Sequence, residues 1–133
     1  ADRDRGARVM AENKSYVFFR ELSLGEPDSP LGTLSIPLQT GRSLAVDTAF
    51  QTLGLPIYVS SPSMAHVGAS GFHRLMIAHD VGSAIKGPER GDIYFGSGDD
   101  AGRAAGITKH NGRFFVFVPN VKALAGIVSG GIA

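Results

Sequence analysis

Short apolar stretches separated by glycine- and proline-rich segments run along the chain and predict a protein built mainly from β-strands. Six stretches are aromatic and β-branched, or alternate apolar with polar residues, as short strands do. The last of them follows an Asn-Gly pair, which favours a tight turn. The strands are expected at residues 16–19, 43–47, 56–59, 72–78, 93–95 and 113–118.

Two other segments carry helical patterns. Residues 2–13 alternate charged side chains with small apolar ones, which predicts a short amphipathic helix. Residues 98–106 begin with Asp99 and Asp100, which suit the positive end of a helix dipole, and continue through alanines. Residues 25–37 and 60–71 are rich in Pro, Ser and Gly and are expected to be surface loops.

Composition narrows the fold class. The 18 glycines and 7 prolines indicate many tight turns between short strands. A chain of 133 residues has room for one domain, or for part of one. Five or six short strands with two short helices, and no repeat or heptad pattern, favour a small β-barrel over a sandwich. We expect a helical lead-in at residues 1–15, the barrel at 16–119, and a tail at 120–133 to which no role is assigned.

Charge and residue usage argue against several partners. Thirteen basic and twelve acidic residues give a net charge of +1, so no long-range field attracts nucleic acid. The sequence lacks cysteine, and no spacing of His, Asp and Glu resembles a metal site. No cofactor is expected, since Gly96-Ser97-Gly98 is too short for a nucleotide loop. No apolar run approaches the roughly 20 residues of a transmembrane segment, and any export signal is expected upstream of the charged residues 1–8.

Three aspartates, Asp47, Asp80 and Asp92, stand at the boundaries of apolar stretches and are the first candidates for chemistry. A carboxylate at a strand end is held by rigid backbone and can face a cleft, which suits acid/base catalysis. Aspartate at such a place more often closes a turn by accepting bonds from backbone N–H groups. The residue types alone leave both interpretations open.

Residues 78–87, which read Ala-His-Asp-Val-Gly-Ser-Ala-Ile-Lys-Gly, resemble the Asp-x-Gly-Gly-Ala-Ile-Lys-Gly signature of the three-aspartate, or 3D, domain. That domain occurs in lytic transglycosylase A and in some cell-wall proteins of Gram-positive bacteria. Residues 41–47 and 90–98 resemble its first and third aspartate strands. The resemblance departs at Ser83, where the signature has a second glycine, and residues 48–55 match poorly.

Three further segments are similar to the membrane-bound lytic murein transglycosylase A family rather than to the short cell-wall modules: residues 13–19, 98–106 and 112–116. The resemblance extends from about Met10 to Pro119. It implies a six-stranded double-psi β-barrel into which a second β-domain is inserted, with the glycan in the groove between them. The inserted domain and the family's N-terminal stretch are absent from this chain.

The resemblance also implies a reaction, partners and a location. The family cleaves the β-1,4 bond between N-acetylmuramic acid and N-acetylglucosamine in the peptidoglycan glycan strand and leaves a 1,6-anhydro ring. Asp80 is then the catalytic residue, first as general acid and then as general base. The missing N-terminal part of the same enzyme is an expected partner. Export to the periplasm and association with the outer membrane are implied for the full-length protein.

Several residues are expected to support Asp80. A protonated aspartate near neutral pH requires apolar burial or a second carboxylate nearby, for which Asp92, and less readily Asp47, is a candidate. Three roles are open for Lys86: it stabilises negative charge, it contacts the lactyl carboxylate of the glycan, or it is a solvated lysine that anchors the turn. Tyr94 and Phe95 are candidates for stacking on sugar rings, although at least one of them is expected to belong to the core. His79 is expected to be structural. The residues expected to contact substrate are Gly82, Ser83, Ala84 and Tyr94.

Two alternatives remain beside the transglycosylase. The first is a module that binds peptidoglycan or another polysaccharide without cutting it, because the double-psi barrel also occurs in such proteins and this chain supplies only one side of the groove. The second is a hydrolase of another β-1,4-glycan, whose products would carry a reducing end instead of an anhydro ring.

Overall fold

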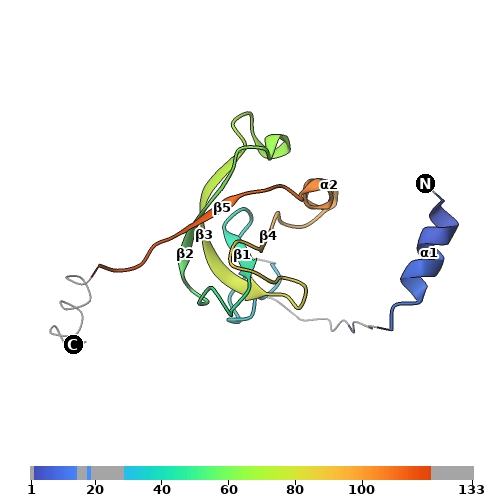
Figure 1. Cartoon of the computed structure of the whole chain (residues 1–133), viewed down its shortest axis with the longest axis horizontal. Coiled ribbons are helices and arrows are strands. Elements are labelled where there is room, and N and C mark those ends of the chain that lie inside the picture. Colours follow the sequence, from blue (N-terminus) through green and yellow to red (C-terminus); the bar gives the residue numbers. More distant parts are fainter. Residues whose placement is uncertain (1, 15–17, 19–28, 121–133) are drawn as a thin grey trace.

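The computed structural model describes residues 2–14, 18 and 29–120, which form a mainly β structure with two α-helices (Figure 1). The helices are α1 (Arg3–Ala11) and α2 (Asp99–Ile107), and a 3-10 turn, η1, covers Ala65–Val67. The strands are β1 (Ser43–Val46), β2 (Pro56–Ser61), β3 (Phe72–Val81), β4 (Gly91–Ile93) and β5 (Arg113–Val116).

The five strands form one sheet in the order β4-β1-β3-β2-β5. β1 and β3 are parallel, and the other neighbours are antiparallel. Within the described residues β4 and β5 are the two edges and do not pair with each other, so the sheet is not closed. The expected closed barrel of six strands is therefore not observed. The strand expected at residues 16–19 lies outside the described residues except for Phe18, which is in no strand.

The predicted mainly β class and both predicted helices are confirmed, while several strand boundaries were wrong. β2 was expected to end at Val59 but continues to Ser61, into the segment predicted to be a loop. β3 was expected to end at Ala78 but continues to Val81, which places Asp80 inside the strand. β4 was expected at residues 93–95 but covers Gly91–Ile93, which places Asp92 inside it. Aspartate has a low strand propensity, and here pairing with β1 overrides that local preference.

The core lies on one face of the sheet because buried apolar side chains alternate along the strands. In β2, the buried residues Ile57, Val59 and Ser61 alternate with half-buried ones. Met76 in the neighbouring strand β3 pairs with Ile57, and both side chains are 0% exposed. Leu44 and Ala78 continue this layer into β1 and along β3. The central strands are thus fixed by their shared buried face.

The two helices contribute little to this core. The described side chains of α1 are exposed, and the helix stands apart from the sheet (Figure 1). Asp2 caps it, with Oδ1 accepting from the N–H groups of Asp4 and Arg5 at 3.1 and 3.0 Å. α2 has Asp99 and Asp100 in its first turn, as predicted. Neither described helix is long and apolar enough to cross a membrane.

Candidate active site

A β-bulge decides which way Asp80 points. Leu44 pairs with Ala78, but the next residue of β1, Ala45, pairs with Asp80, so His79 is the extra residue in β3. Without the bulge, Asp80 would pair with Val46, which is 1% exposed and faces the core. With it, Asp80 shares the face of Ala45. The bulge thus turns a carboxylate away from the apolar core, a common use of bulges beside active sites.

Asp80 and Asp92 stand on either side of Ala45 in a row across three strands. Ala45 pairs with Asp80 in β3 and with Asp92 in β4, so the three side chains point to the same face. Adjacent strands are about 4.8 Å apart, which separates the two aspartate backbones by about 10 Å. All three residues line a pocket of about 280 Å³. Its other walls are Leu38, Ser43, Leu44, Val81, Ile85, Ile93 and Tyr94.

A tight turn from the segment before β1 reaches over to Asp80. The backbone N–H and the hydroxyl of Thr33 both donate to Asp80 Oδ1, at 3.1 and 2.8 Å. Gly32 makes this approach possible, because a Cβ there would lie 2.6 Å from the carbonyl oxygen of His79. The turn therefore packs directly against the end of β3.

Asp47 does not face this pocket and instead anchors a second turn. It follows β1, is 6% exposed, and its Oδ2 accepts from the N–H of Gly87 at 2.8 Å. Its Oδ1 accepts from the N–H of Ala49 at 3.1 Å. Gly87 has φ of +117°, a conformation that other residues rarely adopt. The final glycine of the 78–87 signature is thus the residue that aims an N–H at Asp47.

These bonds set the charge state of Asp47. The N–H of Gly87 first, and that of Ala49 next, hold the pKa of Asp47 below its ordinary value. Burial acts in the opposite direction, and the ammonium of Lys86 adds a further lowering. The Lys86 side chain is 70% exposed, and its Nζ lies 3.9 Å from Asp47 Oδ1. Lys86 is therefore paired with Asp47 and not with Asp80.

Asp47→Asn is expected to remove a pH-dependent part of the stability. A carboxyl whose pKa is lowered by folding stabilises the protein above its unfolded pKa and loses that contribution as pH falls through its folded pKa. The variant should be less stable than the wild type at pH 7, and the difference should shrink below about pH 4. Urea unfolding midpoints measured from pH 7 to acid check this. A difference that stays constant with pH, or an equal effect of Asp99→Asn on exposed α2, contradicts it.

The conformation of the turn after β3 accommodates Ser83, which stands where the family signature has a glycine. The N–H of Ile85 donates to the carbonyl of Gly82 at 3.0 Å, and Ile85 is buried. Among the described non-glycine residues only Ser35 has a positive φ, so Ser83 occupies its place without backbone strain. Ser83 and Ala84 are exposed beside the candidate site.

The two aromatic candidates have different surroundings. Tyr94 lines the pocket with Asp80, and its hydroxyl lies 3.4 Å from Ser29 Oγ and 3.3 Å from Ser97 Oγ. Phe95 packs against the core, as expected of one member of the pair. The ring of His79 lies with Nδ1 2.8 Å from the hydroxyl of Ser43, which is 1% exposed. His79 therefore joins the bulge to β1.

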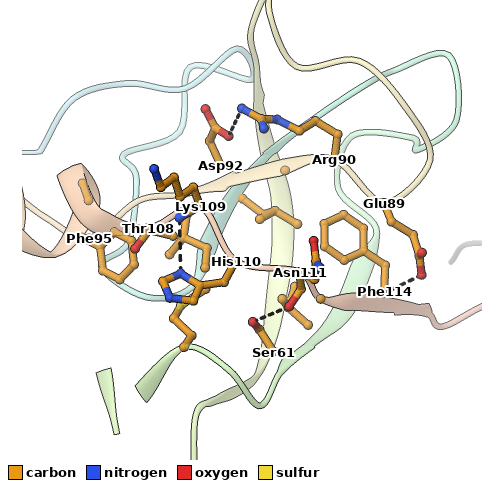
Figure 2. Close-up of a pocket in the computed structure, with 17 residues that line it drawn as sticks. Ser61, Glu89, Arg90, Asp92, Phe95, Thr108, Lys109, His110, Asn111 and Phe114 are labelled. Atoms are coloured by element: carbon orange, nitrogen blue, oxygen red, sulfur yellow. Dashed lines mark hydrogen bonds and ion pairs between the residues drawn. The ribbon is translucent and has the colours of Figure 1, made fainter. Parts of the chain in front are cut away.

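A larger pocket of about 510 Å³ lies on the core side of the sheet (Figure 2). Phe95 and Phe114 belong to its apolar lining, and Lys109 and His110 stand at its polar part. Asp92 also borders this pocket and pairs with Arg90 at 3.2 Å (Figure 2). Asp80 does not line it. Within the described segments, no group of three or more His, Asp or Glu side chains is placed to hold a metal ion.

Thr33 is the residue of this site that the sequence did not indicate. It lies in a segment predicted to be a loop, and 47 positions separate it from Asp80. No local pattern marks such a contact. The only available signal was Gly32, because a glycine in a loop can mark a close approach of two backbones.

Residues 42–118 match the family model of the 3D domain. This match covers more than half of the 133 residues, and the chain belongs to the 3D domain family. Among curated proteins, it is 36% identical over 111 residues to membrane-bound lytic murein transglycosylase A of Escherichia coli K12. It is 39% identical over 108 residues to the protein of that name from Vibrio cholerae.

Solved structures agree with these relatives. The membrane-bound lytic murein transglycosylase of Agrobacterium tumefaciens has a TM-score of 0.77 and 40% identity, with 92% of this chain and 33% of that chain covered. E. coli MltA with bound chitohexaose has a TM-score of 0.71 and 31% identity, over 87% of this chain and 35% of that chain. The chain covers 29% of the curated E. coli relative and 28% of that from V. cholerae, and these matches cover 81% and 79% of the chain.

Proposed function

We propose that this chain is the part of a peptidoglycan lytic transglycosylase that carries the catalytic acid. The observation that supports this most directly is the position of Asp80, which a β-bulge turns out of the core and into a pocket beside Tyr94. The relatives named lytic murein transglycosylases support the reaction type. The substrate bond is the β-1,4 link between N-acetylmuramic acid and N-acetylglucosamine.

One carboxyl performs both proton transfers in the proposed reaction. Protonated Asp80 donates to the glycosidic oxygen as the bond from C1 of the muramic acid to that oxygen breaks. The Asp80 carboxylate then accepts the proton of the muramic C6 hydroxyl as that oxygen bonds to C1 and closes the 1,6-anhydro ring. Asp80 ends protonated again, and no water is consumed. Glycosidases that use water or a covalent intermediate need a second carboxylate for these steps.

Asp47 and Asp92 have different supporting roles in this proposal. Asp47 holds the turn after β3 through Gly87. Asp92 faces the same pocket, and its charge acts on Asp80 only from two strands away. At about 10 Å through water the interaction is on the order of 0.4 kcal/mol before salt screening. The neighbouring Arg90 reduces it further. The effect of Asp92 on Asp80 is therefore small.

Asp92→Asn tests this tuning role. Because the variant removes one negative charge from the pocket, the alkaline limb of the activity profile is expected to move to lower pH by about 0.3 units. The profile is measured on the complete enzyme as the rate of anhydro-muropeptide release, with Asp99→Asn as control. An unchanged limb, or one that moves to higher pH, removes the tuning role.

The relatives' greater length suggests what completes the site. We propose that the remaining part of the full-length protein forms the other side of the glycan groove. We also propose the finer fold that the resemblance implies, a six-stranded double-psi barrel spanning residues 16–119, between the lead-in at 1–15 and the tail at 120–133. We propose that the full-length protein is a periplasmic enzyme attached to the outer membrane, and the relatives' description as membrane-bound supports the attachment to a membrane.

The substrate contacts follow from the pocket. A relative binds chitohexaose, a chain of β-1,4-linked amino sugars. We propose that this chain binds the same linkage, with Tyr94 against a sugar ring beside Asp80. Gly82, Ser83 and Ala84 follow the end of β3, and Ser83 and Ala84 are exposed there. We propose that these three residues contact the glycan from that side. Lys86 remains with Asp47, where it anchors the turn.

A wall-binding module is the second candidate, because the chain covers less than a third of the curated relatives. Product analysis separates the functions. Purified peptidoglycan is incubated with the chain alone and with the chain joined to the rest of the protein, and soluble products are identified by mass spectrometry. Anhydro-muropeptides support the transglycosylase. Products with reducing ends indicate a hydrolase, and binding to sacculi without products from either form indicates a binding module.

A further inference from the structure

The two oxygens of the Asp80 carboxyl have different surroundings. Oδ1 accepts from the backbone N–H of Thr33 at 3.1 Å and from its hydroxyl at 2.8 Å. No hydrogen bond to Oδ2 is found within the described part of the chain. The carboxyl also borders the pocket of about 280 Å³. One oxygen is therefore occupied by the protein, and the other is available to a bound molecule.

This asymmetry decides where a proton sits on Asp80. A backbone N–H can only donate, so the oxygen that it contacts must accept. The hydroxyl oxygen of a protonated carboxyl is a weaker acceptor than its carbonyl oxygen. A proton on Oδ1 would weaken both contacts with Thr33, whereas a proton on Oδ2 preserves them. The neutral acid is thus expected to carry its proton on the free oxygen.

The turn that carries Thr33 is itself well fixed. The N–H of Gly32 donates to the carbonyl of Ile36 at 3.0 Å, and that of Ser35 to the carbonyl of Gly32 at 2.9 Å. The N–H of Leu38 closes the turn by donating to Pro30 at 2.9 Å. A Cβ at Gly32 would lie 2.6 Å from the carbonyl oxygen of His79 and 2.7 Å from Leu38 Cδ2, so the turn is seated against β3. Such a turn can hold a carboxyl in one orientation.

We propose that Thr33 is a positioning residue that holds Oδ1 of Asp80 and so presents Oδ2 as the oxygen that gives and takes the proton. This inference rests on the proposed transglycosylase reaction. In that reaction the same Oδ2 faces first the glycosidic oxygen and then the C6 hydroxyl. Fixing the carboxyl spares it from reorienting between the two steps, which lowers the barrier of the chemical step more than it improves binding.

A substitution of Thr33 can be tested without disturbing the other titratable groups near Asp80. Asp92 from β4 and Tyr94 after it line the same pocket. His79 precedes Asp80 and is engaged with Ser43. Lys86, in the turn after β3, pairs with Asp47. A change confined to the Thr33 side chain leaves all of these in place.

The test is the proton uptake of the Asp80 carboxyl, followed by carbon-detected NMR of this chain. Hydrogen bonds donated to a carboxylate favour its ionised form. In Thr33→Val, which loses the hydroxyl and keeps the N–H, the titration midpoint is expected to move to higher pH by about half a unit to one unit. Thr33→Ser should restore the wild-type midpoint. Thr52→Val, at an exposed threonine of the loop before β2, should match the wild type.

Kinetics of the complete enzyme give a second readout. We expect kcat of Thr33→Val to fall about tenfold with KM within about twofold, and the alkaline limb of its pH profile to move to higher pH. A role that is only structural would lower activity equally at every pH and would not be rescued by Thr33→Ser. Thr33→Ala replaces Thr33→Val if the valine variant fails to fold.

The outcomes separate the two proposals. An Asp80 carboxyl that titrates identically in the wild type and in Thr33→Val overturns the positioning role, whatever the activity. A shifted midpoint in a protein that releases no anhydro-muropeptides supports the contact between Thr33 and Asp80 and contradicts the proposed reaction instead.

Discussion

In the complete enzyme, Asp80→Asn is expected to abolish the release of anhydro-muropeptides while leaving the fold and the binding to peptidoglycan sacculi intact. Asparagine has the same shape, and its carbonyl oxygen can still accept the two bonds that Thr33 donates to Oδ1. It cannot deliver a proton to the glycosidic oxygen or remove one from the C6 hydroxyl. Loss of acid/base catalysis lowers rates by on the order of a hundredfold to ten-thousandfold.

Two controls make this result specific to Asp80. Asp99→Asn changes an exposed aspartate in the first turn of α2 and should retain wild-type activity. The thermal midpoint of Asp80→Asn should stay close to that of the wild type, because this carboxyl lies outside the buried core. Retention of more than about a tenth of the wild-type rate in Asp80→Asn contradicts its role as the proton carrier.

Met76→Ala is expected to cause the largest loss of stability among the predicted changes. Met76 is 0% exposed and stands in β3, where it pairs with the equally buried Ile57. Truncating a buried side chain of this size removes its transfer energy and leaves a cavity, which together cost about 2–5 kcal/mol. Urea unfolding monitored by circular dichroism measures the loss as a lower midpoint with an unchanged slope.

Leu75 is a matched control for Met76, because it is the preceding residue of the same strand and points to the opposite face. Its side chain is 43% exposed, and Leu75→Ala should cost less than about 1 kcal/mol. Comparable losses for the two variants would show that the core is not confined to the face that carries Met76.

The strands that share the buried face could be predicted from the sequence. β1 and β5 fall within the predicted ranges, and β2 runs two residues past its predicted end, to Ser61. Residues such as Ile57 and Val59 give these strands a clear apolar signal. The C-terminal end of β3 and the whole of β4 are strands because they pair with β1, and not because of their local strand propensity. The sequence therefore predicted Asp80 and Asp92 beside strands instead of within them. Local periodicity does not record which strands become neighbours.

The sequence predicted the location of the site better than it predicted the contacts of the site residues. The signature at residues 78–87 led to Asp80 and to the turn that Asp47 holds through Gly87. The bulge at His79 could not be foreseen, since one extra residue changes the face of Asp80 without changing the apolar pattern. The contact with Thr33 spans 47 positions and exists only after folding.

The most direct test of the proposed reaction is digestion of peptidoglycan in water labelled with heavy oxygen, followed by mass spectrometry of the released muropeptides. Attack by the substrate's own C6 hydroxyl predicts products that contain no label and that have lost the mass of one water relative to hydrolysed muropeptides. Products that carry one labelled oxygen at the muramic reducing end would show that water attacks C1, and the single-carboxylate transglycosylase mechanism would then be wrong.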